Sequence, residues 1–302
     1  MKVGFIGLGA MGLPMAKRVM GGGFALVTMF HHRREPAEEL AALGASIVQT
    51  PAEVARNADV VITIVPADSE LTETVLGANG IIEGIERGKI LIDMTTATAR
   101  TLVEAEKALA QRGARVLDAP VSGGTTGAEN GTLTIMAGGD AGLLAEVRPL
   151  LETMGKNIVH VGGVGQGKLV KIVNQAMAAV NLLVMGEAFA LGVRCGADPK
   201  ILFDVIKASS GYSRMMDARL PGFLFEDFFK PGFKLDLMKK DVNLALDTAK
   251  SLGVPLMFGS LASQVFAAAS SAGRGQEDFA AAADFLAGLS GAKLNRPPER
   301  TA

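Results

Sequence analysis

The sequence has very little of four residue types that often carry chemistry. Its 302 residues include one Cys, three His, one Tyr and no Trp. Cys195 has no second cysteine with which to form an internal disulfide. The histidines, His31, His32 and His160, form no cluster with it at metal-ligand spacing. We therefore expect neither an internal disulfide nor a metal site.

Neither sign of charge is in excess. Lys and Arg total 30, and Asp and Glu total 31, which gives a formal net charge of −1. A chain with this balance lacks the basic surface by which most nucleic-acid-binding proteins hold their partner. We expect no nucleic-acid partner.

Long hydrophobic runs are missing as well. The longest apolar stretch, around residues 176–184, contains Asn181 and is shorter than the about 20 residues that cross a membrane. The apolar run at residues 2–6 is too short for a signal peptide. We expect no membrane span and a cytoplasmic location.

Short apolar runs alternate with helical stretches from residue 1 to about residue 160. Strands are expected at residues 2–6, 26–30, 46–48, 60–65, 90–94, 116–117 and 157–160. Helices are expected at residues 13–20, 35–42, 52–57, 69–76, 100–112 and 143–154. Such regular alternation predicts an α/β fold with a mostly parallel sheet that helices cover on both faces.

The pattern changes after residue 161. Residues 162–167 are rich in glycine, and Ala, Leu, Met and Phe then recur at helical spacing. We place a domain boundary there, between residues 1–163 and 164–302. A helix over residues 168–194 would be about 40 Å long and is apolar nearly all round, so we expect it to be buried under other helices or against a second subunit. The tail after Gly291 is expected to fray.

A glycine-rich loop follows the first expected strand and opens the first expected helix. It consists of Gly7, Leu8, Gly9, Ala10, Met11 and Gly12, a G-x-G-x-x-G pattern. In a dinucleotide-binding unit these glycines permit a tight turn, close approach of the pyrophosphate and packing of helix on strand. A plain turn is the alternative in a chain with 37 glycines, but the flanking strand and helix favour a cofactor loop.

The end of the second expected strand bears on the choice of cofactor. An acidic residue there would hold the ribose 2′-hydroxyl of NAD, whereas basic residues accommodate the 2′-phosphate of NADP. This chain has His31, His32, Arg33 and Arg34 and no acid before Glu35. The pattern favours NADP. Two alternatives stay open: a solvated basic loop, or an arginine that stacks on adenine and leaves NAD equally acceptable.

A second glycine-rich segment contains Ser122, Gly123 and Gly124. Its backbone N–H groups carry little side-chain bulk, which suits a concave site for a carboxylate. A tight turn between two strands is the other interpretation.

Four motifs in order resemble those of the β-hydroxyacid dehydrogenases, the family of 3-hydroxyisobutyrate dehydrogenase, tartronate semialdehyde reductase and 2-(hydroxymethyl)glutarate dehydrogenase. They are F-I-G-L-G-A-M-G at residues 5–12, D-A-P-V-S-G-G at residues 118–124, G-x-x-x-K-x-x-N at Gly167, Lys171 and Asn174, and F-x-x-x-L-x-x-K-D at Phe233, Leu237, Lys240 and Asp241. Four ordered motifs are far more specific than any one of them.

The resemblance implies a Rossmann-type, mostly parallel sheet domain and an all-α C-terminal domain, joined by a long interdomain helix. It implies an NAD(P)-dependent oxidoreductase that interconverts a short 3-hydroxy acid and its 3-oxo acid, a semialdehyde. It further implies a homodimer or homotetramer.

The resemblance also implies roles for individual residues. Lys171 is the expected catalytic residue. Ser122, Gly123 and Gly124 would hold the substrate carboxylate, and Asn174 would orient the substrate. The cofactor would be lined by Val65, Pro66, Ala67, Thr96 and Lys240, besides the glycine loop. The His31–His32 pair departs from the family, whose members more often carry Asp or Asn-Arg there.

The residues themselves also point to Lys171. It lies in an apolar stretch of a helix expected to be buried, where desolvation disfavours the charged ammonium form and favours proton exchange. Asn174 and Gln175 follow three and four residues later, near the same helix face. Rival proton carriers are scarce, since His31 and His32 belong to the adenosine end. A lysine that extends to solvent at a helix end is the alternative.

Substrate specificity is expected in the turn at residues 209–214, which contains Tyr212. Arg214 or Arg219 could meet a second carboxylate, or either could be a solvated helix residue. Without the resemblance, residues 239–241 would be interpreted as a surface charge run.

Two other functions stay open. An imine reductase has the same fold, but that group characteristically carries another residue at the position of Lys171. A non-catalytic nicotinamide-binding regulator is the second, and the intact Ser122, Lys171 and Asn174 argue against it. The choice among short semialdehydes and hydroxy acids is left open by the sequence.

Overall fold

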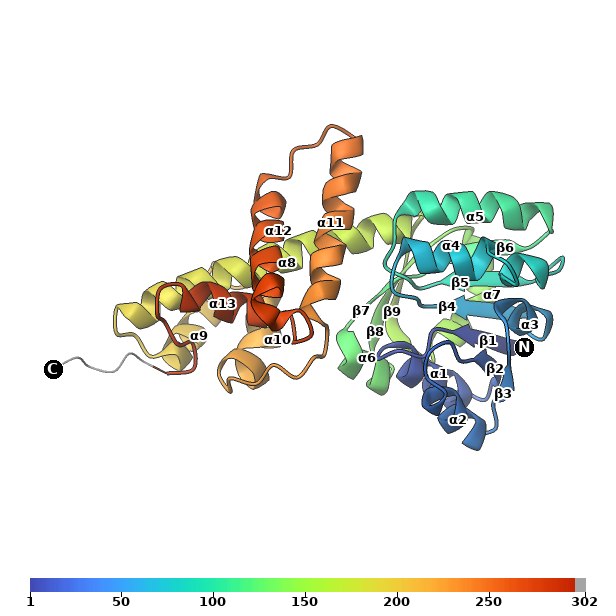
Figure 1. Cartoon of the computed structure of the whole chain (residues 1–302), viewed down its shortest axis with the longest axis horizontal. Coiled ribbons are helices and arrows are strands. Elements are labelled where there is room, and N and C mark those ends of the chain that lie inside the picture. The colour runs from blue at the N-terminus through green and yellow to red at the C-terminus, as the bar shows by residue number, and fades with distance from the viewer. Residues whose placement is uncertain (297–302) are drawn as a thin grey trace. The chain divides into compact units, whose positions relative to one another are not determined.

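The computed structural model describes residues 1–296 of the chain (Figure 1). The chain divides into two compact units, Met1–Lys171 and Ile172–Ala302, and each is described by itself. The boundary predicted after residue 163 stays a prediction.

Within the described part of the chain, nine strands of the N-terminal unit form one sheet. They are β1 (Lys2–Ile6), β2 (Ala25–Met29), β3 (Ser46–Val48), β4 (Val60–Thr63), β5 (Ile90–Asp93), β6 (Arg115–Asp118), β7 (Val121–Ser122), β8 (Leu133–Gly138) and β9 (Gly155–Gly162). The order is β3-β2-β1-β4-β5-β6-β8-β7, and β9 pairs with β8. β8 is antiparallel to β6 and β7, and the other pairs are parallel. The predicted mostly parallel sheet is confirmed.

Helices cover both faces of this sheet (Figure 1). One face packs α1 (Gly12–Gly21), α2 (Glu35–Ala42), α6 (Gly124–Asn130) and α7 (Ala141–Leu151). The other packs α3 (Pro51–Arg56), α4 (Asp68–Leu76), the short 3-10 helix η1 (Ile81–Glu83) and α5 (Ala99–Gln111). Because both faces are covered, central strands such as β4 and β5 are buried at every position, which explains their continuous apolar runs.

The expected strands and helices agree with the structure to within a few residues at their ends. One segment was not expected: β7, α6 and β8 lie in residues 121–138, where the sequence indicated only glycine-rich turns. The turn at Gly123 joins a strand to a helix, so the interpretation of residues 122–124 as a turn between two strands is wrong.

The C-terminal unit is helical. The long helix α8 (Gln166–Arg194) begins in the N-terminal unit and continues into this one. The other helices are α9 (Pro199–Lys207), α10 (Arg214–Arg219), η2 (Leu220–Leu224), α11 (Leu235–Ser251), α12 (Met257–Ala269), η3 (Ser270–Arg274) and α13 (Ala281–Gly288). Their core includes Phe189, Leu220, Val242 and Phe266. An all-α C-terminal domain was predicted, and among the residues described after β9 no further strand occurs.

Helix α8 is not covered all round by other helices of the described chain, and burial of its exposed face against a second subunit stays a prediction. Val173, Met177 and Leu191 are 52%, 63% and 67% exposed on one face. By length and composition α8 is also the one described helix that could cross a membrane, although core helices of soluble proteins meet the same criteria. The expectation of no membrane span rested on residues 176–184 alone, whereas the whole helix Gln166–Arg194 meets these two criteria.

The expected fraying after Gly291 does not begin at once. Ala292 and Leu294 are 4% and 1% exposed and belong to the helical core. Pro297, Pro298, Glu299 and Arg300, which were part of the same expectation, lie outside the described residues.

Candidate functional site

The glycine loop joins β1 to α1 at the carboxyl edge of the sheet. Gly7 has φ +100°, and a Cβ atom there would lie 2.1 Å from the Ile64 carbonyl oxygen. A Cβ atom on Gly12 would lie 1.7 Å from the Gly7 oxygen. On Gly9, by contrast, a Cβ atom would meet nothing within 4 Å. Gly7 and Gly12 are thus needed by the fold. Gly9 leaves open space in which the phosphates of a ligand can come close to the protein backbone.

A basic pocket opens beside this loop. Its volume is about 370 Å³, and its lining consists of Leu8, Gly9, Ala10, Leu13, Pro14, Lys17, Arg18, Arg33 and Glu129. The predicted Arg33 lines the pocket, whereas His31 and His32 are exposed with ring centroids 3.9 Å apart and are not in the lining. Three positive side chains beside a glycine loop and a helix N-terminus fit an anionic group such as a pyrophosphate or phosphate.

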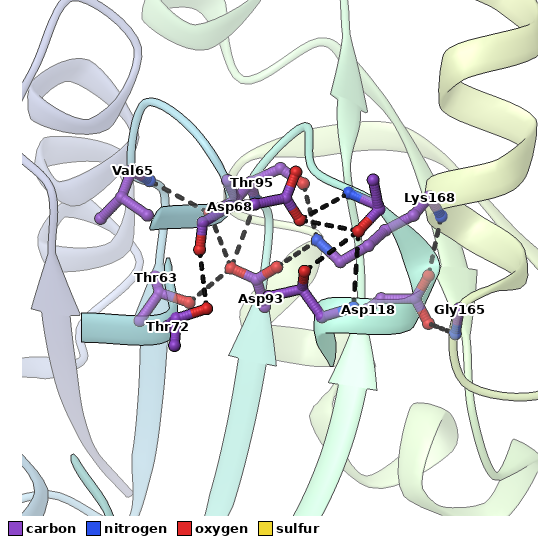
Figure 2. A network of polar contacts seen from close by, with 11 residues as sticks. Thr63, Val65, Asp68, Thr72, Asp93, Thr95, Asp118, Gly165 and Lys168 are labelled. Carbon is purple, nitrogen blue, oxygen red and sulfur yellow. Dashed lines mark hydrogen bonds and ion pairs between the residues drawn. The ribbon is translucent and has the colours of Figure 1, made fainter. Parts of the chain in front are cut away.

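The loops after β4 and β5 reach the same edge, because β1, β4 and β5 are adjacent and parallel. Val65, Pro66 and Ala67 follow β4, and Thr96 follows β5. The two loops are bonded to each other: the Val65 N–H donates to the Thr95 hydroxyl oxygen at 3.1 Å (Figure 2). The predicted cofactor-lining residues of this unit therefore gather at one edge of the sheet.

Ser122 ends β7, Gly123 connects it to α6, and Gly124 is the first residue of that helix. Gly123 has φ +137° and Gly124 has φ +63°, conformations that favour glycine. Ser122 is paired with Thr134 of β8, so its backbone is held in the sheet. The segment combines a serine whose backbone is held in the sheet with two glycines that are exposed or partly exposed, an arrangement that suits an anion.

The start of α8 is fixed to the end of β6. The buried Asp118 accepts hydrogen bonds from the backbone N–H groups of Gly165 and Lys168, both at 2.8 Å (Figure 2). Burial raises the pKa of the Asp118 carboxyl, and these two N–H groups oppose that rise. Lys171 follows one turn later and is 7% exposed. The candidate catalytic lysine is therefore buried on a helix whose first turn is held by the sheet.

In the C-terminal unit, a buried carboxylate connects three of the predicted residues. Asp241 is 1% exposed and accepts a hydrogen bond from the Gln175 side-chain amide at 2.8 Å. The Asn174 amide donates to Gln175 at 3.1 Å, and Lys240 Nζ lies 3.0 Å from the other Asp241 oxygen. The alternative interpretation of residues 239–241 as a surface charge run is therefore wrong for Asp241.

Tyr212 is not part of that network. Its hydroxyl donates to Asp217 at 2.6 Å, and this hydrogen bond raises the pKa of the phenol. Arg214 is exposed, as expected of a solvated helix residue. Arg219 is not a solvated residue, because its guanidinium lies 3.1 Å from Asp278 and 4.4 Å from the Phe279 ring centre. Contact of Arg219 with a second carboxylate stays a prediction.

Several residues of these networks were missed from the sequence. Lys17 and Arg18 lie one to two turns after the glycine loop, and their position on the first helix is a signal that could have been used. Asp241 ends the fourth motif, but no role was predicted for it. Asp93 and Lys168 gave no signal, because a single charged residue in a helix or at a strand end is normally solvated.

Comparison with known protein families finds matches over both parts of the chain. Residues 2–162 match the family described as the NAD binding domain of 6-phosphogluconate dehydrogenase, and residues 165–286 match the NAD-binding family of NADP-dependent 3-hydroxyisobutyrate dehydrogenase.

Two curated relatives cover nearly the whole chain. The 2-(hydroxymethyl)glutarate dehydrogenase of Eubacterium barkeri is 38% identical over 281 residues, which cover 93% of this chain and 93% of the relative. The 2-hydroxy-3-oxopropionate reductase of Escherichia coli (strain K12) is 36% identical over 295 residues, which cover 97% and 100%.

Solved structures agree. Mycobacterium tuberculosis 3-hydroxyisobutyrate dehydrogenase with L-serine has a TM-score of 0.86 at 32% identity, covering 94% of this chain and 98% of that one. Psf3 in complex with NADP+ and 2-OPP has a TM-score of 0.85 at 27% identity, covering 94% and 99%.

We expect Gly9→Ala to weaken dinucleotide binding about tenfold or more without lowering thermal stability. The added methyl group meets nothing in the protein but occupies the side on which a pyrophosphate approaches. Fluorescence titration with NADPH and NADH measures binding, and thermal unfolding measures stability. Gly12→Ala is the matched control, because its methyl group meets the Gly7 carbonyl and should lower the melting temperature. Unchanged cofactor affinity in Gly9→Ala would refute this role.

Proposed function

The chain belongs to the β-hydroxyacid dehydrogenase family, whose members are NAD(P)-dependent oxidoreductases, and from this premise we propose that it interconverts a short 3-hydroxy acid and its semialdehyde with Lys171 as the acid–base group. The observation that carries the proposal is the burial of Lys171, at 7% exposure, on a helix whose first turn is hydrogen-bonded to the sheet edge where the cofactor loops gather. Buried ammonium groups exchange protons more readily near neutral pH than solvated ones.

The proposed chemistry needs one proton and one hydride. A bound nicotinamide supplies the hydride to the aldehyde carbon in the reductive direction and accepts it in the oxidative one. Lys171 donates its proton to the carbonyl oxygen as the hydroxyl forms, and it takes the hydroxyl proton in reverse. Ser122 and the backbone N–H groups of Gly123 and Gly124 hold the substrate carboxylate.

Residues of the C-terminal unit complete the proposal. From the resemblance we propose Asn174 and Gln175 as substrate-binding residues and Lys240 as a cofactor-binding residue. Asp241 supports this assignment, because its carboxylate holds the Gln175 amide and pairs with Lys240.

Other proton carriers are less suited to the role. The Tyr212 hydroxyl donates to Asp217, and the raised pKa keeps the phenol protonated. A ring nitrogen of His160 is bonded to the Gly139 carbonyl at 2.8 Å. An imine reductase would carry another residue in place of Lys171, so the lysine also favours the hydroxyacid reaction.

We propose NADP as the preferred cofactor, with NAD as the alternative. Arg33 stands in the pocket beside Gly9 and Ala10 together with Lys17 and Arg18, and the loop holds no acidic residue before Glu35. A positively charged set of this kind suits a 2′-phosphate. A homodimer or homotetramer stays a prediction.

The substrate is tested by a panel. We expect NADPH consumption with at least one of tartronate semialdehyde, glyoxylate, succinate semialdehyde, methylmalonate semialdehyde and 2-formylglutarate. The oxidative direction is assayed with serine, 3-hydroxyisobutyrate and 3-hydroxypropionate. Absence of turnover with all of them, despite tight cofactor binding, would favour a non-catalytic regulator.

Lys171→Ala should lower kcat on the best substrate by several orders of magnitude, because the proton then has no donor at the carbonyl oxygen. Cofactor affinity, followed by NADPH fluorescence, should stay close to that of the wild type. A variant with near-wild-type turnover would remove Lys171 from the mechanism.

Arg33→Ala should raise the NADPH dissociation constant about 10- to 100-fold and leave that of NADH nearly unchanged, since a hydrogen bond to a charged group contributes about 1.5–3 kcal/mol. The matched control is Arg34→Ala, whose guanidinium lies 4.7 Å from the Phe30 ring centre and 3.5 Å from Glu38. A clear preference of the wild type for NADH would contradict the NADP assignment.

A further inference from the structure

The proposed chemistry leaves one fully buried cation without a role. Lys168 is 0% exposed, and its Nζ donates to the carboxylate of Asp93 and, at 2.8 Å, to the Thr95 carbonyl oxygen (Figure 2). Asp93 is also 0% exposed. Transfer of two charges from water into a protein interior is costly, and apolar side chains of similar volume are often at least as stable. Such a pair therefore needs a reason other than stability.

Asp93 joins the two loops proposed to line the nicotinamide. Its second oxygen accepts hydrogen bonds from the hydroxyl groups of Thr63 at 2.6 Å and Thr95 at 2.7 Å. The Thr95 hydroxyl oxygen in turn accepts from the Val65 N–H at 3.1 Å. One carboxylate thus sets the position of the loop after β4, at Val65, and of the loop after β5, next to Thr96.

Lys168 connects this carboxylate to helix α8. Its backbone N–H donates to Asp118, so the main chain of Lys168 is held on β6 while its side chain reaches β5. Lys171 lies three residues later, about 4.5 Å further along the helix axis. All of these contacts lie within the N-terminal unit.

We propose that Lys168 is a positioning residue that sets the distance between the proton donor and the nicotinamide loops. It does so by fixing the helix turn that carries Lys171 to the Asp93 carboxylate that holds those loops. The inference rests on the proposed function, because it takes Lys171 as the acid–base group and Val65 and Thr96 as cofactor-lining residues. Errors of about 1 Å in such a distance can lower rates about 100-fold.

The test compares Lys168→Met with Lys168→Met/Asp93→Asn. The single variant leaves an unpaired buried carboxylate and should lose thermal stability. The double variant removes that charge and should regain much of the melting temperature. In both we expect kcat to fall about 10- to 100-fold and the NADPH dissociation constant to rise severalfold, because the loops and the lysine are no longer held together.

Lys89→Met is the matched control. Lys89 precedes β5 at the opposite end of the strand from Asp93, and its Nζ donates to the carbonyl oxygens of Ala55 at 2.7 Å and Arg56 at 2.8 Å. Its loss should lower stability but leave kcat and cofactor affinity unchanged. All measurements are made well below the melting temperature, with kcat at saturating cofactor and substrate.

The outcomes separate the two proposals. If the Lys168 variants keep kcat and the NADPH dissociation constant within twofold of the wild type, Lys168 serves stability alone and the inference is wrong. Recovery of full kcat in the double variant would likewise overturn it, since the defect would then come from the unpaired Asp93. If the single variant does not fold, the double variant decides. Retained turnover in Lys171→Ala refutes the proposed function instead.

Discussion

The candidate site depends on a single buried carboxylate at the end of β6. Asp118 accepts the backbone N–H groups of Gly165 and Lys168 and so fixes where α8 starts. The contact requires glycine on both sides: a Cβ atom on Gly167 would lie 2.2 Å from the Met136 carbonyl, and one on Gly138 would lie 2.4 Å from Asp118 itself. These close approaches explain why glycine is needed at positions 138 and 167. The position of Lys171, the proposed proton donor, therefore depends on two backbone N–H groups that are bonded to one buried carboxylate.

Buried and exposed positive charges have different effects in this protein. The formal net charge of −1 shows neither kind, because it is a sum over the whole chain. Lys168 lies beside Asp93 in the interior, where removal of one partner of such a pair costs about 3–5 kcal/mol. That is a large part of the about 5–15 kcal/mol by which a domain is stable. Arg33 is exposed, so its field is screened within about 10 Å by salt. Lys168 can therefore hold helix α8 in a fixed position relative to β5, whereas Arg33 can distinguish only between ligands that come into direct contact with it.

The sequence predicts those helices and strands that neighbouring residues mark by their periodicity and by their turn or capping residues. The helix at Glu35–Ala42 and the strand at Ser46–Val48 were predicted with their observed ends, because the periodicity and the flanking residues mark them. The region of β7, α6 and β8 was missed, since its glycines resemble turns and its antiparallel pairing with β6 is set by distant residues. The same holds for the site. The loop at Gly7 was recognised from adjacent residues, whereas the bond from Lys168 to Asp93 joins positions 75 residues apart and depends on the tertiary fold.

The composition of helix α8 does not predict which of its residues are buried. Its apolar composition predicted burial under other helices or against a second subunit. Within this chain Val173 and Met177 are exposed on one face, whereas Lys171 and Gln175 are buried. Composition averages over the helix, whereas burial is decided position by position by what each side chain meets. On this helix three polar residues, Lys168, Lys171 and Gln175, are buried, and Gln175 has its partner in Asp241, whereas apolar residues lie on the surface. A polar side chain inside an apolar helix was the more informative signal, and it pointed to Lys171 before any contact was known.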